Sequence, residues 1–199
     1  MRTIKYPNKR ILIMCEGLTE YYYAKSLQQE MPKSIQRGVL IEVQHDSRND
    51  PVSLVLAAQK RKKMARSERN PFDTVWIFFD NDNRPLLQLE EAFRLINKEG
   101  FRYAYSSICL EHWFILHFCN CGKSFQKPEE ALNFLIKKWP QYDKTKVNLY
   151  FTLRDKLELA IKNSLLIKKI SDKNIPIHKM NPYFTIPDLI SFFRDLSTT

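Results

Sequence analysis

The sequence of 199 residues lacks any run of about 20 apolar residues, the length that a helix needs to cross a membrane. Met1–Arg10 is polar and basic, and no apolar stretch long enough for a secretory signal follows it. Cysteine is scarce, with four residues in the whole sequence. Without a secretory signal, free thiols in a reducing compartment are the simplest interpretation. These absences predict a cytoplasmic protein with no membrane segment.

The sequence also shows no internal repeat and no low-complexity tract. Its hydrophobic content of 44% and aromatic content of 13% are typical of a globular protein with a packed core. The length suits one sizeable α/β domain, or one domain with a small appendage. Acidic residues are outnumbered, 22 Asp and Glu against 32 Lys and Arg, and the net charge is +10. This balance favours a polyanionic partner, either nucleic acid or an acidic membrane surface, although charge alone is weak support.

Short apolar runs alternate with amphipathic stretches along the first half of the sequence. Continuous apolar runs of this kind are typical of strands that are buried on both faces of a parallel sheet. A helix cap is expected at Thr19 and a helix end at Gly100. The predicted strands are Arg10–Cys15, Val39–Gln44, Thr74–Asp80 and Phe101–Ser106, and the predicted helices are Thr19–Glu30, Pro51–Arg69 and Leu86–Glu99. The alternation predicts an α/β fold with a mainly parallel sheet and helices on both faces.

After Ser107 the character of the sequence changes, because helical patterns replace the alternation of strands and helices. The predicted helices are Leu110–Phe118, Pro128–Trp139, Leu153–Ile170 and Ile186–Leu196. We expect residues 1–119 to form a catalytic core and residues 120–199 to form a helical C-terminal region packed on it. No clean linker separates the two, and Asn120–Lys127 is the best candidate for a break.

Carboxylates follow two of the predicted strands directly. Glu16 comes after the first strand, and Asp80 and Asp82 come at the end of the third. In open parallel sheets, functional groups gather at the carboxyl ends of the strands, so these side chains are expected to meet. Carboxylates crowded beside an apolar core repel one another unless a cation is present, and oxygen ligands of this kind suit Mg²⁺ or Mn²⁺. Glu20, about one helical turn after Glu16, could serve a second metal of the kind used in phosphodiester cleavage.

Each of these acidic motifs alone is more often a solvated turn or a helix cap than a functional site. An Asp-x-Asp pair after a strand is common, and Glu16-Gly17 alone is no more specific. Because both motifs directly follow predicted buried strands, together they favour a metal site.

Four segments resemble the motifs of RloB-like proteins and occur in the order of that family. Glu16-Gly-Leu-Thr-Glu20, followed by Tyr23, resembles an EGxTE motif, and Phe79-Asp-Asn-Asp82 resembles a strand-terminal DxD. Ser107–Phe118 is similar to the most specific of the motifs, S-x-P-x-F-E-x-W-x-L-L-H-F, and Asn181–Thr185 is similar to N-P-x-x-T. The sequence departs from the family at Ile108-Cys109, where Asn-Pro is frequent.

The resemblance implies a TOPRIM fold, the compact Rossmann-like sheet shared by topoisomerases, bacterial primases and several nucleases. In that fold the first glutamate, here Glu16, acts as general acid or base, and the DxD pair, here Asp80 and Asp82, holds Mg²⁺. Related nucleases of phage-defence systems add a second acidic residue, matched by Glu20, and a serine–glutamate pair. Ser106 or Ser107 with Glu111 matches that pair, although the spacing is longer here. RloB-like proteins are typically encoded beside an ATPase in restriction or abortive-infection loci. The resemblance therefore implies an AAA- or ABC-type ATPase as a partner.

Basic residues outside these motifs suggest contacts with a polyanion. Lys60, Lys63 and Arg66 lie on the second long helix, where they form either a phosphate-binding face or an ordinary solvated face. Lys179, close to the late N-P motif, could fold back over the carboxylates and stabilise charge on a cleaved phosphate.

Histidine and cysteine also cluster after Glu111, at His112, His117, Cys119 and Cys121. Their spacing is not that of a standard zinc finger, so ordinary packing at a buried helix end is the favoured interpretation and a zinc site the alternative.

The acidic motifs and the family resemblance together imply a metal-dependent TOPRIM nuclease that hydrolyses phosphodiesters of DNA or of RNA such as tRNA, as an effector of anti-phage defence. The alternative is a non-catalytic subunit that binds nucleic acid or regulates a defence ATPase. Nucleotidyl transfer of the primase or topoisomerase kind is disfavoured, because the sequence has no zinc-ribbon segment and no separate strand-passage domain with a catalytic tyrosine.

Overall fold

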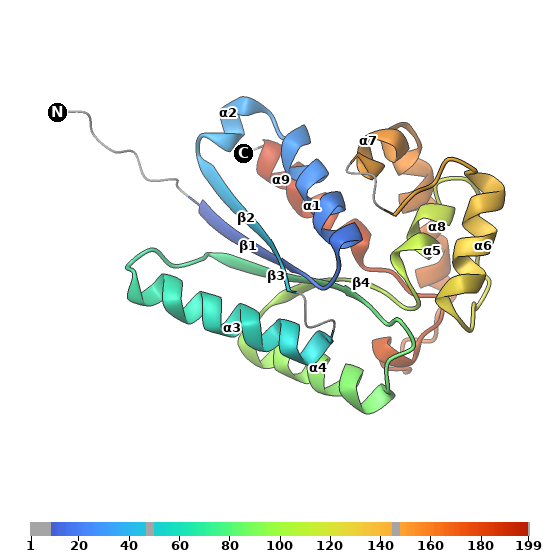
Figure 1. Cartoon of the computed structure of the whole chain (residues 1–199), viewed down its shortest axis with the longest axis horizontal. Helices are drawn as coiled ribbons and strands as arrows, with labels where there is room; N and C mark the ends of the chain where they lie inside the picture. The colour runs from blue at the N-terminus through green and yellow to red at the C-terminus, as the bar shows by residue number, and fades with distance from the viewer. Residues whose placement is uncertain (1–8, 47–49, 145–147, 199) are drawn as a thin grey trace.

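The structure is a computed structural model that describes residues 9–46, 50–144 and 148–198. A mixed order of strands and helices gives way to helices alone after β4 (Figure 1). The strands are β1 (Lys9–Cys15), β2 (Val39–His45), β3 (Thr74–Asp80) and β4 (Arg102–Ser106). The longer helices are α1 (Leu18–Glu30), α3 (Pro51–Ser67), α4 (Leu86–Glu99), α6 (Pro128–Lys138), α8 (Leu157–Ile170) and α9 (Ile186–Thr198). The shorter ones are α2 (Lys33–Gln36), α5 (Leu110–Ile115), α7 (Leu149–Leu153), η1 (Arg154–Lys156) and η2 (Ile177–Lys179).

The four strands form one parallel sheet in the order β2-β1-β3-β4. β1 and β3 are the central strands, and each is apolar along almost its whole length because both of its faces are covered. Their pairing aligns Cys15 with Phe78, so that β1 and β3 end close together at the carboxyl edge. The predicted parallel, Rossmann-like α/β sheet is confirmed.

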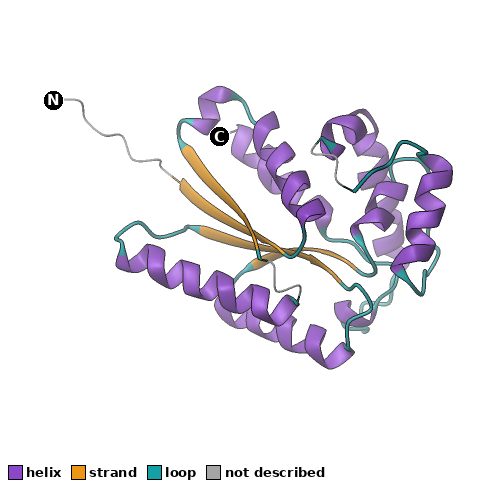
Figure 2. Cartoon of the chain, viewed as in Figure 1, coloured by secondary structure: helices purple, strands orange, loops and turns teal. Residues whose placement is uncertain are grey.

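Helices cover both faces of this sheet, as Figure 2 shows. α3 and α4 pack on one face, where Leu12, Ile77 and Phe79 belong to the same core cluster as Leu54 and Leu89. α1 and α9 cover the other face. Because successive strand residues point to opposite faces, the continuous apolar runs of β1 and β3 supply both cores.

The C-terminal helices belong to the core on the α1 side. Buried residues of α6, α7 and α8 lie in one cluster with Ile13 of β1, Trp76 of β3 and Trp113 of α5. The C-terminal helices therefore pack on the sheet domain through a shared core. The boundary expected near residue 119 stays a prediction.

Three local expectations need correction. The helix predicted over Leu153–Ile170 begins later, at Leu157, because α7 ends at Leu153 and the 3-10 turn η1 precedes α8. The apolar positions keep helical spacing across this turn, and the pattern therefore conceals the break. The helix predicted over Leu110–Phe118 ends at Ile115. Thr19 is not the cap of α1, because that helix begins at Leu18 and its cap is Gly17.

Gly100 ends α4 as predicted. It adopts a left-handed conformation with φ of 65°, and its backbone N–H donates to carbonyls of the last turn. No helix in the described part of the chain is long and apolar enough to cross a membrane.

The segment that follows η2 joins the outer edge of the sheet beside β4. Ser106 and Phe184 form an antiparallel bridge, and the Tyr183 N–H donates to Oγ of Ser107 over 2.9 Å. Oγ1 of Thr185 accepts from the Tyr105 N–H over 2.9 Å. These contacts explain why the late N-P-x-x-T motif lies next to the segment that begins at Ser107.

Thr185→Val should destabilise the fold, because it leaves the buried N–H of Tyr105 without its acceptor. An unsatisfied buried donor costs about 1–3 kcal/mol. Urea unfolding should show this loss. The control is Thr152→Val at an exposed position of α7, where the hydroxyl donates to the Asn148 carbonyl and we expect a change within about 0.5 kcal/mol. Equal effects of the two substitutions would contradict the proposed role of Thr185.

Candidate active site

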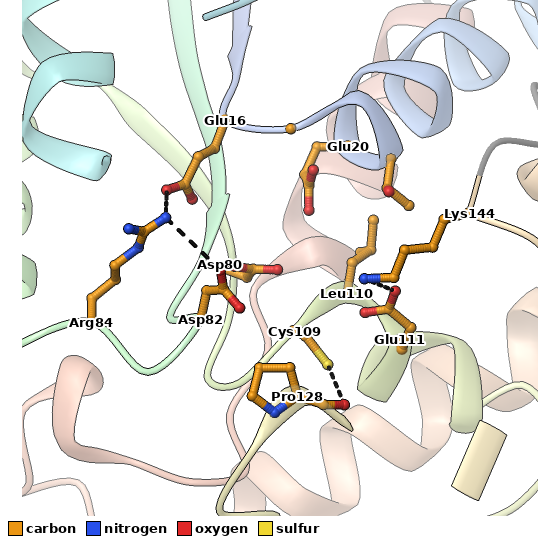
Figure 3. A pocket seen from close by; sticks show the side chains of 12 residues that line it. Glu16, Glu20, Asp80, Asp82, Arg84, Cys109, Leu110, Glu111, Pro128 and Lys144 are labelled. Atoms are coloured by element: carbon orange, nitrogen blue, oxygen red, sulfur yellow. Dashed lines mark hydrogen bonds and ion pairs between the residues drawn. The ribbon is translucent and has the colours of Figure 1, made fainter. Parts of the chain in front are cut away.

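A cavity of about 200 Å³ opens at the carboxyl edge of the sheet, between the start of α1, the turn after β3 and the start of α5 (Figure 3). Carboxylates from separate segments face it, and a basic side chain lies on each side of them (Figure 3). The lining residues are Glu16, Gly17, Thr19, Glu20, Asp80, Asp82, Arg84, Cys109, Leu110, Glu111, Pro128 and Lys144.

Glu16 continues directly from β1. Its backbone N–H donates to the carbonyl of Phe78, which extends the ladder between β1 and β3 by one residue and fixes the position of Glu16. The side chain is buried, and its Oε1 accepts from Nη2 of Arg84 over 3.2 Å. Its other oxygen, Oε2, is buried and has no hydrogen-bond partner among the described residues. Burial raises the pKa of Glu16 to about 7, although the nearby Arg84 guanidinium opposes this shift.

Asp80 ends β3, and Asp82 lies in the turn that follows. Asp82 and Asn83 adopt left-handed conformations with φ of 44° and 57°, which Asp and Asn tolerate better than most residues. The Asp82 N–H donates to the carbonyl of Ile108 over 2.8 Å, and this bond holds the turn against the loop that precedes α5. The pKa of Asp80 is raised well above its usual value, first by burial and then by the surrounding carboxylates. The largest of these repulsions comes from Glu20.

Glu20 lies in the first turn of α1 and is buried. A Cβ atom at Gly17 would lie 2.6 Å from Oε2 of Glu20, so glycine at position 17 allows the carboxylate to fold back over the helix start. Burial raises the pKa of Glu20 to about 7, and the charges of Glu111 and Glu16 add to this shift. The positive end of the helix dipole favours a carboxylate at this place.

Glu111 lies in the first turn of α5 and is buried. Its Oε1 accepts from the Tyr142 hydroxyl and from Nζ of Lys144, each over 2.9 Å. Both partners come from the segment between α6 and α7, so the C-terminal region completes the wall of the cavity. Lys144 keeps 55% of its side chain exposed, and it remains accessible from the cavity as well as paired.

The donor set suits a hard divalent cation in its chemistry. The carboxylate oxygens are of the type that Mg²⁺ and Mn²⁺ prefer, and Glu16 offers one buried oxygen without a partner. The side chains are not yet placed to coordinate one ion together. Within residues 9–46, 50–144 and 148–198, no three His, Cys, Asp or Glu side chains stand close enough to hold one ion. The residues thus fit a metal by chemistry, whereas the arrangement with Arg84 beside Glu16 is not a finished coordination site.

The structure brings together the five carboxylates singled out from the sequence, Glu16, Glu20, Asp80, Asp82 and Glu111, around one cavity.

Other predicted residues lie elsewhere. Lys179 is in η2 and lines a different cavity, together with Ile170 and Asn181. Lys60, Lys63 and Arg66 are exposed on α3, which begins near the carboxyl edge and runs back along the sheet, away from the cavity (Figure 1). At 1.5 Å per residue, Lys60 is about 14 Å and Arg66 about 22 Å along the helix from Pro51. Nucleic-acid binding by this face stays a prediction.

Sequence reasoning missed the two basic residues of the cavity. Arg84 follows Asp82 by two residues, so the charge pattern of the turn was a usable signal. Lys144 had no such signal, because its partner Glu111 is 33 residues away along the sequence and no local pattern links them.

The serines, histidines and cysteines near Glu111 have structural contacts. Ser106 donates to the carbonyl of Cys109 over 2.7 Å, and the Ser107 hydroxyl accepts from the Tyr183 N–H, so both stabilise loops outside the cavity lining. The ring of His112 packs edge-on against Phe125. Burial lowers the pKa of His112 and of His117 to about 4, so both rings are neutral near pH 7. Cys119 is partly buried and Cys121 is buried, and neither forms a disulfide.

The parallel sheet and the acidic cavity at its carboxyl edge place the protein among Rossmann-like α/β proteins with a carboxylate site. The family model for RloB-like proteins matches residues 11–193, which is most of the chain, and the protein belongs to the RloB-like family. No curated protein sequence matches the chain.

The raised pKa of Glu20 predicts a stability that depends on pH. The folded state keeps the proton up to a pKa of about 7, whereas the unfolded carboxyl loses it near 4.5, so stability falls as pH rises from about 4.5 to 7 and stays low above. Glu20→Gln keeps the shape of the protonated acid and removes this titration. We expect the stability of the native protein relative to Glu20→Gln to fall by on the order of 1–3 kcal/mol between pH 5 and pH 8.

Urea unfolding in the presence of a chelator at the two pH values measures this difference. All other ionisable residues are common to both proteins, so the comparison isolates the effect of the carboxyl group at position 20. Glu129→Gln, at an exposed position of α6, is the matched control and should show no pH-dependent difference. If the stability difference between the native protein and Glu20→Gln were the same at both pH values, the raised pKa of Glu20 would be contradicted.

Proposed function

We propose that the protein is a metal-dependent nuclease that hydrolyses phosphodiesters of RNA, such as tRNA, or of DNA. The observation that supports this most directly is the meeting of five carboxylates from three separate parts of the chain in one cavity, with Arg84 and Lys144 on either side. A net charge of +10 despite this acidic cavity favours a polyanionic substrate.

Glu16, Asp80 and Asp82 are the residues that would hold Mg²⁺ or Mn²⁺. When bound, such an ion would polarise a phosphoryl oxygen and lower the pKa of a water molecule. Glu20 is suited to proton transfer because its pKa of about 7 lets it both accept and donate a proton near neutral pH. Lys144 can contact phosphate oxygens at the cavity entrance, and its pairing with Glu111 keeps the ammonium group in place.

The biological setting is proposed from the family. Membership in the RloB-like family supports a role as an effector of anti-phage defence in the cytoplasm, with an AAA- or ABC-type ATPase encoded nearby as partner.

A second candidate function is a non-catalytic subunit that binds nucleic acid or regulates the ATPase. The pairing of Arg84 with Glu16 favours it, because an acidic site neutralised by the protein's own cation is stable without a metal.

Asp80→Asn should abolish Mn²⁺-dependent cleavage of nucleic acid. Loss of a central metal ligand removes several kcal/mol of transition-state stabilisation, so we expect the cleavage rate to fall by at least about 100-fold. The assay uses purified protein with Mn²⁺ and tRNA, other RNA, and single- and double-stranded DNA, with and without the ATPase. Asp155→Asn on exposed η1 is the matched control and should cleave normally.

Absence of cleavage on every substrate, even with the ATPase, would sink the nuclease proposal. If such an inactive protein still bound nucleic acid or changed the ATPase rate, and Asp80→Asn did so equally, the second candidate would be favoured.

A further inference from the structure

The turn after β3 brings a cation of the protein itself among the proposed metal ligands. Nη2 of Arg84 lies 3.2 Å from Oε1 of Glu16 and 3.8 Å from Oδ2 of Asp82 (Figure 3). One guanidinium nitrogen therefore faces two of the three carboxylates that the proposed function assigns to the metal.

This contact differs from an ordinary surface ion pair. Only 8% of the Glu16 side chain and 25% of the Arg84 side chain are exposed, so solvent screens the pair weakly. Nε of Arg84 is buried and, in the described part of the chain, has no acceptor. An unpaired buried donor is unfavourable, so the attraction of the guanidinium to the carboxylates is what favours this position. Arg84 thus supplies positive charge where the carboxylates would otherwise repel one another.

A divalent ion would need the same space. Mg²⁺ requires carboxylate oxygens at about 2.0–2.1 Å, so an ion held by Glu16 and Asp82 would have to approach the same two oxygens that Nη2 of Arg84 now faces. The guanidinium of Arg84 and a divalent ion at the same carboxylates would also repel each other strongly, because the site is partly buried.

We propose that Arg84 is a positioning residue that occupies the metal position between Glu16 and Asp82, and that a divalent cation binds only as Arg84 withdraws. The inference rests on the proposed function, because it assumes that these carboxylates are metal ligands.

The turn allows this exchange without unfolding. The backbone N–H of Arg84 donates to the carbonyl and to Oδ1 of Asn81, so the backbone stays fixed while the side chain moves. Asn83 and Pro85 on either side are exposed, which leaves room for the guanidinium to swing toward solvent. Arg84 therefore sets a threshold for metal binding, since the ion must displace an ion pair that is already formed.

Mn²⁺ binding without substrate, measured by isothermal titration calorimetry at pH 7.5, tests the proposal. Arg84→Gln should bind Mn²⁺ at least about tenfold more tightly than the native protein, because the competing charge is gone. Arg84→Lys should stay close to the native affinity, since an ammonium group can still pair with Glu16. Arg94→Gln, which removes the same charge from the exposed face of α4, is the matched control and should change nothing.

Asp80→Asn distinguishes the failure of this proposal from the failure of the metal site. If Asp80→Asn loses Mn²⁺ binding while Arg84→Gln binds no more tightly than the native protein, the metal site stands and the role of Arg84 is wrong. If neither the native protein nor Arg84→Gln binds Mn²⁺, or if Asp80→Asn binds it unchanged, the metal site itself is wrong. Thermal unfolding checks that each variant is folded. If Arg84→Gln does not fold, Arg84→Met replaces it and should show the same tighter binding of Mn²⁺.

Discussion

Five carboxylates face one cavity at the carboxyl edge of the sheet, and like charges gathered beside a buried core repel one another. Asp80 stands at the centre of this repulsion, because Glu20, Glu16, Asp82 and Glu111 all raise its pKa. Such an arrangement is unfavourable near neutral pH unless protons, basic side chains or a bound cation compensate. The structure contains two of these compensations. The raised pKa values of Glu16, Glu20 and Asp80 favour bound protons, and Arg84 and Lys144 supply positive charge.

The fold concentrates charge in this way for geometric reasons. Parallel strands all end at the same edge, so the residues that follow β1 and β3 must lie close together. The starts of α1 and α5 add Glu20 and Glu111, each in the first turn of its helix. Helix starts carry partial positive charge, which is why they accept carboxylates that the sheet core would disfavour. Position 17 has to be glycine-like in size, because the carboxylate of Glu20 occupies the space of a Cβ atom there.

Much of the sheet and of the acidic group could be predicted, because both depend on local patterns. The run Thr74–Asp80 is apolar and β-branched, and β3 has the predicted bounds. Glu16 and Asp80 were found because Glu16 directly follows a strand and Asp80 ends one. Lys144 could not be found, since its contact with Glu111 depends on how the C-terminal region packs. The start of α8 was placed too early for the opposite reason, because η1 preserves the apolar spacing that a continuous helix would show.

The central claim is that this group of carboxylates is a cation site. Anomalous X-ray diffraction from crystals soaked in Mn²⁺ tests it most directly, because the signal locates the ion without reference to activity. We predict a manganese peak within coordination distance of Asp80 and of Glu16 or Asp82, with the Arg84 guanidinium displaced from Glu16. Well-ordered crystals that show no manganese at Asp80, with Arg84 still paired to Glu16, would contradict it.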